Sequence, residues 1–94
     1  MTRNVRIDYS NKFNKQLKKL PSEIKIAFRN RLALFIKNQF NPLLNNHALS
    51  GNLKGSRSIN ITGDWRAIYS EKIDKNGENY IVFELLGTHS QLYK

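Results

Sequence analysis

The spacing of the hydrophobic residues changes from a helical period to a strand period about halfway along the chain, and this change limits the fold most. Near the N-terminus, apolar residues recur at i, i+4 and i+7, the period of an amphipathic helix: Phe13, Leu17 and Leu20. Ser10 or Asp8 can cap this helix, and Pro21 cannot continue it. The first helix is therefore expected between Ser10 and Pro21.

A second helix is predicted directly after the first. Pro21, Ser22 and Glu23 supply an N-terminal proline, a capping hydroxyl and an acid near the positive end of the helix dipole. The apolar stripe that follows has helical spacing: Ile24, Phe28, Leu32, Phe35 and Ile36. We expect this helix to end near Asn38, and we expect the two helices to form an antiparallel hairpin with buried apolar stripes and exposed lysines.

Alternating apolar and polar residues predict one strand before the helices and three after them. The strands are expected at residues 4–8, 56–62, 65–71 and 80–86. Gly63 and Asp64 form a tight turn, and Asn76-Gly77 is the pair that a type I′ hairpin turn prefers. Residues 41–55, which contain His47, are expected to be a loop.

This order of elements predicts an α+β fold in one domain, residues 1–94. The N-terminal strand and the helical hairpin should pack on one face of a small, mainly antiparallel sheet. The other face of the sheet stays open. With the 41–55 loop and the C-terminal tail, that open face is where a concave site is expected.

The net charge of +9 is the first indication of function, because a small domain this basic is attracted to polyanions. Residues 1–40 hold ten Lys or Arg against two acids, and residues 41–94 hold six against five. One interpretation is binding to nucleic acid or to an acidic partner. The alternative is that the lysines only solvate the helices.

Residue types that are missing from the chain exclude several classes of protein. The chain has no cysteine, so a disulfide framework and cysteine metal sites are excluded. No apolar run resembles a signal peptide or a membrane span, so we expect a soluble, cytoplasmic protein without membrane contact. Neither a metal-ligand spacing nor a phosphate-binding glycine loop is found, so no metal and no cofactor is expected.

Polar residues with chemical capacity are concentrated in the second half of the chain: His47, Lys54, Arg57, Asp64, Trp65, Arg66, His89 and Tyr93. Two histidines and several cations suit metal-free cleavage of RNA, in which a base takes the proton of a ribose 2′-OH and an acid protonates the leaving 5′-oxygen. Arginine stabilises the charged phosphorane. Each residue also has an ordinary structural interpretation, such as packing for Trp65 and Tyr93 or solvation for Arg57 and Arg66.

Four motifs together resemble the RelE/ParE toxin superfamily, most closely its YafQ branch, over nearly the whole chain. The motifs are His47-Ala-Leu-Ser-Gly51, Gly55-Ser-Arg57, Asp64-Trp65, and Gly87-Thr-His89 followed by Leu92-Tyr93. The resemblance implies a RelE-like fold and a toxin of a bacterial type II toxin-antitoxin system that cuts mRNA on the translating ribosome and leaves a 2′,3′-cyclic phosphate.

The same resemblance implies roles for individual residues. His47, Asp64 and His89 would take part in proton transfer or positioning, with His47 or Asp64 as the base and His89 as the acid. Trp65 and Tyr93 would orient or stack the substrate. Lysines of the first helix would contact ribosomal RNA: Lys12, Lys15, Lys18 and Lys19.

Two positions depart from the pattern of the YafQ branch. An arginine is usual where this chain has Leu85, and a histidine is usual where it has Asn60. RelE sequences proper carry an arginine after an aromatic residue, as in Trp65-Arg66 here, so Arg66 with Arg57 or Lys54 is expected to serve the phosphate.

The resemblance also implies partners and leaves two other functions open. The partners would be a cognate antitoxin, the ribosome with its mRNA, and operator DNA bound by the toxin-antitoxin complex. One alternative function is a ParE-like inhibitor of DNA gyrase, against which His47 and His89 argue. The other is a catalytically weakened module that mainly binds its antitoxin.

Overall fold

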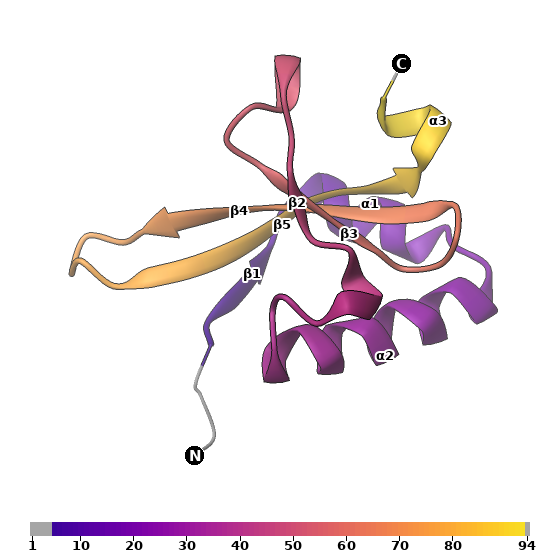
Figure 1. Ribbon diagram of the computed structural model, residues 1–94, viewed down its shortest axis with the longest axis horizontal. Helices are drawn as coiled ribbons and strands as arrows, with labels where there is room; N and C mark the ends of the chain where they lie inside the picture. The colour runs from indigo at the N-terminus through magenta and orange to yellow at the C-terminus, as the bar shows by residue number, and fades with distance from the viewer. Residues whose placement is uncertain (1–4, 94) are drawn as a thin grey trace.

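The described part of the chain folds into three helices and one five-stranded sheet, which confirms the predicted α+β class (Figure 1). The structure, a computed structural model, describes residues 5–93. The helices are α1 (Asn11–Lys18), α2 (Ser22–Lys37) and α3 (His89–Leu92), with short 3-10 turns at Pro42–Leu44 and Gly51–Leu53. The strands are β1 (Ile7–Tyr9), β2 (His47–Ala48), β3 (Arg57–Asn60), β4 (Trp65–Ile73) and β5 (Asn79–Thr88), in the order β1-β5-β4-β3-β2.

Both long helices form where the apolar period predicts them, and Ser10 is the predicted cap of α1, but the cap of α2 differs from the prediction. Ser10 caps α1, since its Oγ accepts the Phe13 N–H at 3.0 Å. Pro21 is itself the N-cap of α2, in an extended conformation and without a side-chain cap. The capping role predicted for Ser22 is therefore wrong, because Ser22 is already the first residue of the helix.

The sheet contains the predicted N-terminal strand and the predicted antiparallel meander, and it adds the unpredicted strand β2 at one edge. β3, β4 and β5 pair in antiparallel order, and β1 pairs in parallel with β5 through Ile7 and Ile81. Of the residues predicted as the first strand, residue 4 lies outside the described residues, Val5 and Arg6 are not in a strand, and the strand begins at Ile7. β5 continues to Thr88, two residues beyond the predicted end.

The segment predicted as a loop at 41–55 contains β2, so the prediction is wrong at His47. His47 pairs with Ser58 and Ala48 pairs with Arg57 at the open edge of β3. A strand of two residues leaves no alternating pattern to detect, and its position is set by β3 and not by its own sequence.

The hairpin turn between β4 and β5 also differs from the prediction. Gly77 has a positive φ of +80°, but Asn76 does not, so the turn is not type I′. The Asp74 side chain accepts the N–H groups of Asn76 and Glu78 at 2.8 and 3.0 Å, which stabilises a turn with only Gly77 left-handed.

An aromatic core holds the helices against one face of the sheet. Phe83 of β5 is fully buried at its centre, with five aromatic rings at centroid distances of 5.5 to 6.0 Å: Tyr9, Phe13, Phe28, Phe35 and Tyr69. The loop around residues 49–56 and α3 both rise from the side of the sheet opposite to α2 (Figure 1).

Within residues 5–93, no helix is long and apolar enough to cross a membrane.

Candidate functional site

The open face of the sheet brings polar side chains from three strands into two adjacent rows. Asn60, Arg66 and Gly87 are paired across β3, β4 and β5. The next row contains His47 and Ser58, continued by Ile68 and Leu85. Because side chains of directly paired residues lie on the same face, the register alone gathers His47, Asn60 and Arg66 there.

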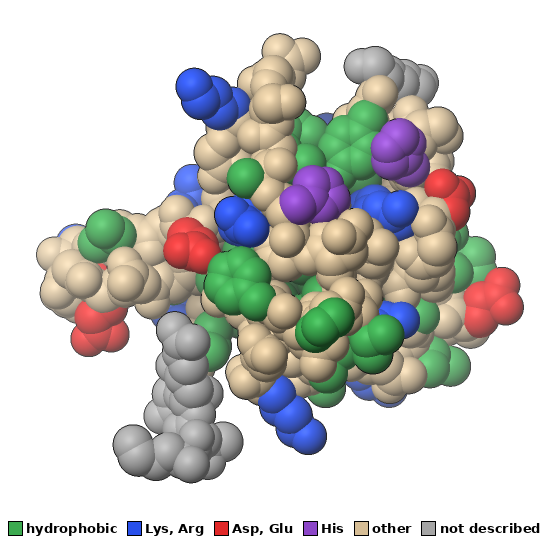
Figure 2. Space-filling view, in the orientation of Figure 1, with side chains coloured by type: hydrophobic (Ala, Val, Ile, Leu, Met, Phe, Trp, Pro, Cys, Tyr) green, Lys and Arg blue, Asp and Glu red, His purple; other side chains and the backbone are tan. Residues whose placement is uncertain are grey.

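A cavity of about 430 Å³ lies over these rows. Four of the predicted catalytic residues line the cavity: His47, Arg66, His89 and Tyr93. The rest of the lining comes from β2 and the residues next to it: Asn45, Ala48, Leu49 and Ser50. Figure 2 shows both histidines on one face of the molecule with a basic side chain between them. No acidic residue lines the cavity, so its described lining favours an anion.

The ring of His47 is oriented by a backbone contact. Its Nδ1 lies 2.8 Å from the carbonyl oxygen of Asn45. A carbonyl can only accept, so Nδ1 carries the proton and Nε2 of the neutral ring has a free lone pair. Asn45 has a left-handed conformation with φ of 45°, which asparagine tolerates better than most residues. His47 is thus arranged to accept a proton at Nε2.

Arg66 is held by the turn that precedes β4. Its Nη1 donates to the carbonyl oxygens of Thr62 at 3.0 Å and Trp65 at 3.2 Å. Among residues 5–93, no hydrogen bond uses its Nε or Nη2, and no acid forms an ion pair with it. The half-buried guanidinium therefore keeps donors for an anion.

The short helix α3 is fixed firmly although it lies near the end of the chain. The Thr88 Oγ1 accepts the Gln91 N–H at 3.3 Å, and the Gln91 Oε1 accepts the Thr88 N–H at 2.9 Å, which is a complete capping box. The His89 N–H also donates to the carbonyl of Asp64 at 3.0 Å. A side chain at Gly87 would approach Gln91 to 3.0 Å, so glycine lets α3 pack closely against β5.

His89, the first residue of α3, and Tyr93, its C-cap, lie about one helical turn apart and contact each other. Their ring centroids are 4.7 Å apart, with a tilt of 58° between the planes. The Tyr93 hydroxyl is buried without a partner among the described residues, and the same is true of Ser58 Oγ and Asn60 Oδ1. Buried polar groups usually have partners, so these three oxygens are exceptions among the described residues.

Four other predicted site residues lie outside the cavity lining. Asp64 is exposed in the turn before β4, and only its carbonyl contacts α3. Lys54 is exposed after the second 3-10 turn. Arg57 donates from Nε to Asn46 at 2.7 Å and lies over the Phe40 ring at 5.4 Å. Trp65 lies on the face opposite Arg66, where it packs against the core.

The lysines predicted to contact RNA lie on α1 and at its C-cap, Lys19, and they divide into two groups. Lys12 and Lys19 line a groove between α1 and β5, whereas Lys15 and Lys18 are exposed outside it. Leu85, which replaces the usual arginine, lines this groove and not the histidine cavity. Within residues 5–93, no three potential metal-ligating His, Cys, Asp or Glu side chains are grouped together.

Sequence reasoning missed two features that build the site. The carbonyl of Asn45 orients His47, and this backbone contact has no signal in the sequence. The capping box that starts α3 does have one, since Thr88 and Gln91 form the T-x-x-Q pattern that indicates a helix N-terminus.

Comparisons with known proteins agree with this fold. Residues 5–94 match the family model described as "Bacterial toxin of type II toxin-antitoxin system, YafQ". No curated protein sequence matches the chain significantly. Among solved structures, YafQ from Escherichia coli BL21(DE3) has a TM-score of 0.75 at 26% identity, covering 97% of this chain and 100% of that one.

Two further structures define how far the similarity extends. The E. coli DinJ-YafQ toxin-antitoxin complex contains a chain that matches with a TM-score of 0.71 and 28% identity, over 100% of both chains. A YoeB/ParE toxin from Agrobacterium tumefaciens matches with a TM-score of 0.72 at 12% identity, over 90% of this chain and 99% of that one, which is a likeness of fold alone. Since the family model spans nearly the whole chain, the protein belongs to the YafQ family of bacterial toxins of type II toxin-antitoxin systems.

Proposed function

We propose that this toxin is a metal-free endoribonuclease that cleaves mRNA on the translating ribosome. The observation that carries the proposal is the convergence of His47, Arg66, His89 and Tyr93 on one cavity with no acid in its lining. Two groups suited to proton transfer and one anchored cation are the minimum set for cleavage assisted by the ribose 2′-OH.

The reaction uses the two histidines in opposite roles. Nε2 of His47 takes the proton of the ribose 2′-OH, and the 2′-oxygen attacks the phosphorus. The bond from phosphorus to the 5′-oxygen breaks as His89 donates a proton to that oxygen. The products are a 2′,3′-cyclic phosphate and a 5′-hydroxyl. The Nδ1 contact of His47 with Asn45 favours it over Asp64 as the base, since Asp64 does not line the cavity.

Arg66 stabilises the charge that develops on the phosphorane. Its Nη1 is fixed by Thr62 and Trp65, so the remaining donors are held in position before substrate arrives. Arg66 thus supplies the cation that Leu85 does not, and Tyr93 orients the nucleotide beside His89.

Contacts outside the cavity bind the toxin to the ribosome and to the antitoxin that inhibits it. Lysines on α1 bind the backbone of ribosomal RNA, a contact that does not depend on sequence and weakens with salt. By analogy with the E. coli DinJ-YafQ complex, an antitoxin binds this toxin. The excess of positive charge in residues 1–40 favours an acidic segment in that antitoxin.

The test is expression of the toxin without its antitoxin, together with single substitutions. We expect His89→Ala and Arg66→Ala each to relieve growth arrest, and we expect cleavage of mRNA on purified translating ribosomes to fall by about 100-fold or more. Lys72→Ala, an exposed cation elsewhere on β4, is the matched control and should remain toxic. Product ends should carry a 2′,3′-cyclic phosphate.

Two outcomes would contradict this function. Full toxicity of both His89→Ala and Arg66→Ala would show that the cavity is not the site of action. Inhibition of supercoiling by DNA gyrase with purified toxin, without any mRNA cleavage, would favour the gyrase inhibitor instead.

A further inference from the structure

Phe40 is a large aromatic side chain that the core does not use. It follows α2 and is 60% exposed, whereas the other four phenylalanines are at most 6% exposed. A single exposed apolar side chain is ordinary on a protein surface, so the surroundings of the ring decide whether it forms a binding surface.

A guanidinium group lies over this exposed ring. Cζ of Arg57 is 5.4 Å from the centroid of the Phe40 ring, and the Nε of Arg57 donates to Asn46 Oδ1 at 2.7 Å. Among residues 5–93, no hydrogen bond or ion pair uses the two Nη atoms of Arg57. The ring stays exposed with the guanidinium in place. A stacking surface beside a cation with free donors suits a nucleotide, which has both a base and a phosphate.

The ring and the guanidinium are held in place from below by the hydroxyl of Tyr69, a fully buried residue. This oxygen accepts from Asn46 Nδ2 at 2.7 Å and from Gln39 Nε2 at 3.0 Å. Asn46 Nδ2 also donates to the carbonyl of Gln39 at 3.0 Å. Gln39 precedes Phe40, and Asn46 holds Arg57, so one hydrogen-bond network positions both groups. A ligand that uses them therefore loses little side-chain entropy of the protein on binding.

This pair is continuous with the histidine cavity on the side of His47. Arg57 pairs with Ala48, which lines the cavity next to His47. β2 is an edge strand, and β3 and β4 separate it from β5, which leads into α3 and His89. On the face shown in Figure 2, basic and hydrophobic side chains continue past one histidine on the side away from the other. Phe40 and Arg57 therefore extend the cavity beyond His47, away from His89.

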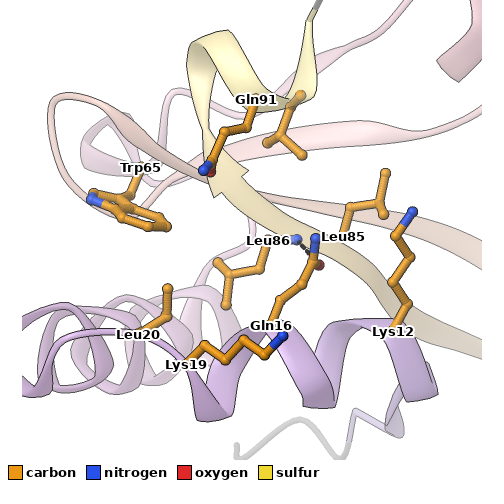
Figure 3. Close-up of a pocket in the computed structure, with 9 residues that line it drawn as sticks. Lys12, Gln16, Lys19, Leu20, Trp65, Leu85, Leu86 and Gln91 are labelled. Atoms are coloured by element: carbon orange, nitrogen blue, oxygen red, sulfur yellow. Dashed lines mark hydrogen bonds between the residues drawn. The ribbon is translucent and has the colours of Figure 1, made fainter.

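The other candidate aromatic residues are not placed on this side of the cavity. Figure 3 shows the ring of Trp65 beside Leu20, in the groove between α1 and β5 and not in the cavity. The ring of Tyr93 lies against His89, at the opposite end of the cavity from β2. Stacking of a base next to His47 is therefore left to Phe40.

The roles of the two histidines give the RNA a direction across this surface. His47 takes a proton from the ribose on the 5′ side of the cut, and His89 protonates the oxygen on the 3′ side. We propose that Phe40 and Arg57 form an upstream subsite, which binds a nucleotide on the 5′ side of the cut by stacking its base on Phe40 and pairing a phosphate with Arg57. This rests on the proposed function, because the direction follows from the proton transfers assigned there.

The first experiment measures KM and kcat for cleavage of a defined mRNA on purified ribosomes. Phe40→Ala should raise KM by about tenfold and leave kcat within about threefold, because the ring binds the substrate and does not touch the reacting atoms. Phe40→Trp should restore a KM close to wild type, since an indole also stacks on a base. Leu43→Ala removes another exposed apolar side chain of the same segment, 63% exposed, and should leave both constants unchanged.

The second experiment locates the nucleotide with mRNAs that lack one base. An abasic site at the first or second position upstream of the cut should lower kcat/KM of the wild type by about tenfold. The same abasic site should cost Phe40→Ala about twofold or less, because the stacking contact is already absent. An abasic site at the first downstream position should affect the two proteins equally.

Three outcomes would overturn the upstream subsite and leave the nuclease proposal intact. One is an unchanged KM for Phe40→Ala while His89→Ala abolishes cleavage. Another is coupling of Phe40 to the downstream position alone, which would reverse the assigned direction. The third is weaker binding of the antitoxin by Phe40→Ala with normal cleavage, which would make the ring a protein contact. Absence of mRNA cleavage by the wild type would instead refute the proposed function itself.

Discussion

The two faces of the sheet are formed by the same strands, but one packs against the helices and the other carries polar side chains. On the helix side, Ile59, Ala67 and Phe83 are fully buried in an aromatic core. On the open side, Asn60 and Arg66 alternate with those residues, and Asn60 Oδ1 is buried without a partner among residues 5–93. Apolar packing is thus concentrated on one face, whereas the other face carries polar side chains that take no part in the aromatic core.

The largest expected effect tests the helix side of this comparison. Phe83→Ala removes the central ring of the aromatic core and should lower the free energy of unfolding by about 3–5 kcal/mol. A domain of this size has only about 5–15 kcal/mol of stability in total. Urea unfolding followed by circular dichroism measures the change. Phe40→Ala, at a ring that is 60% exposed, is the control and should cost about 1 kcal/mol or less. Similar losses for the two variants would contradict the concentration of stability in the core.

An intermediate loss of stability is expected at Asn46, because its side chain links the buried Tyr69 to the segment that carries His47. Its Nδ2 donates to the Tyr69 hydroxyl at 2.7 Å, and its Oδ1 accepts from Arg57 at 2.7 Å, next to His47. Asn46→Ala should lower the free energy of unfolding by about 1–3 kcal/mol, because buried partners lose their hydrogen bonds. It should also reduce mRNA cleavage, since β2 and His47 lose support.

The control for Asn46 lies in the same region of the chain. Asn52 is exposed, and its side chain forms no hydrogen bond within residues 5–93, so Asn52→Ala should change neither quantity. If Asn46→Ala left cleavage unchanged while stability fell, the support of His47 by this network would be wrong.

The smallest change in the free energy of unfolding is expected at Tyr93, on the open side of the sheet. The Tyr93 hydroxyl is buried and unpartnered within the described residues, so Tyr93→Phe should leave the free energy of unfolding within about 1 kcal/mol of wild type. Cleavage should fall if the hydroxyl contacts the nucleotide, as proposed. Parallel urea and cleavage assays make the test. A loss above about 2 kcal/mol would mean that the hydroxyl serves the folded protein and not the substrate.

The sequence predicts elements whose apolar residues repeat locally, and it predicts poorly those elements whose position depends on residues distant in sequence. Phe13, Leu17 and Leu20 identify α1 because the apolar stripe of a helix repeats locally. The separation of Trp65 from Arg66 could also have been predicted, since neighbours on a strand point to opposite faces. The position of His47 could not, because β2 exists only by pairing with Ser58 and Arg57.

The candidate site shows the same division. The two histidines and Arg66 could be chosen from their chemistry, but their convergence depends on the register of β3, β4 and β5. Asp64 is a reasonable candidate by residue type, but the contact of its carbonyl with the His89 N–H could not be predicted, because every residue has a carbonyl. The left-handed conformation of Asn45 likewise depends on the surrounding structure.

The parallel pairing of β1 with β5 has a consequence for synthesis of the toxin. Ile7 can pair only after Ile81 has been synthesised, and pairings so distant in sequence form late in folding. The segment that closes the sheet is followed at once by α3, which begins at His89 and is capped by Tyr93. A nascent chain that lacks β5 therefore has neither a complete sheet nor a complete cavity. Assembly of the cavity therefore requires that β5 and α3 have been synthesised, because His89 and Tyr93 belong to its lining.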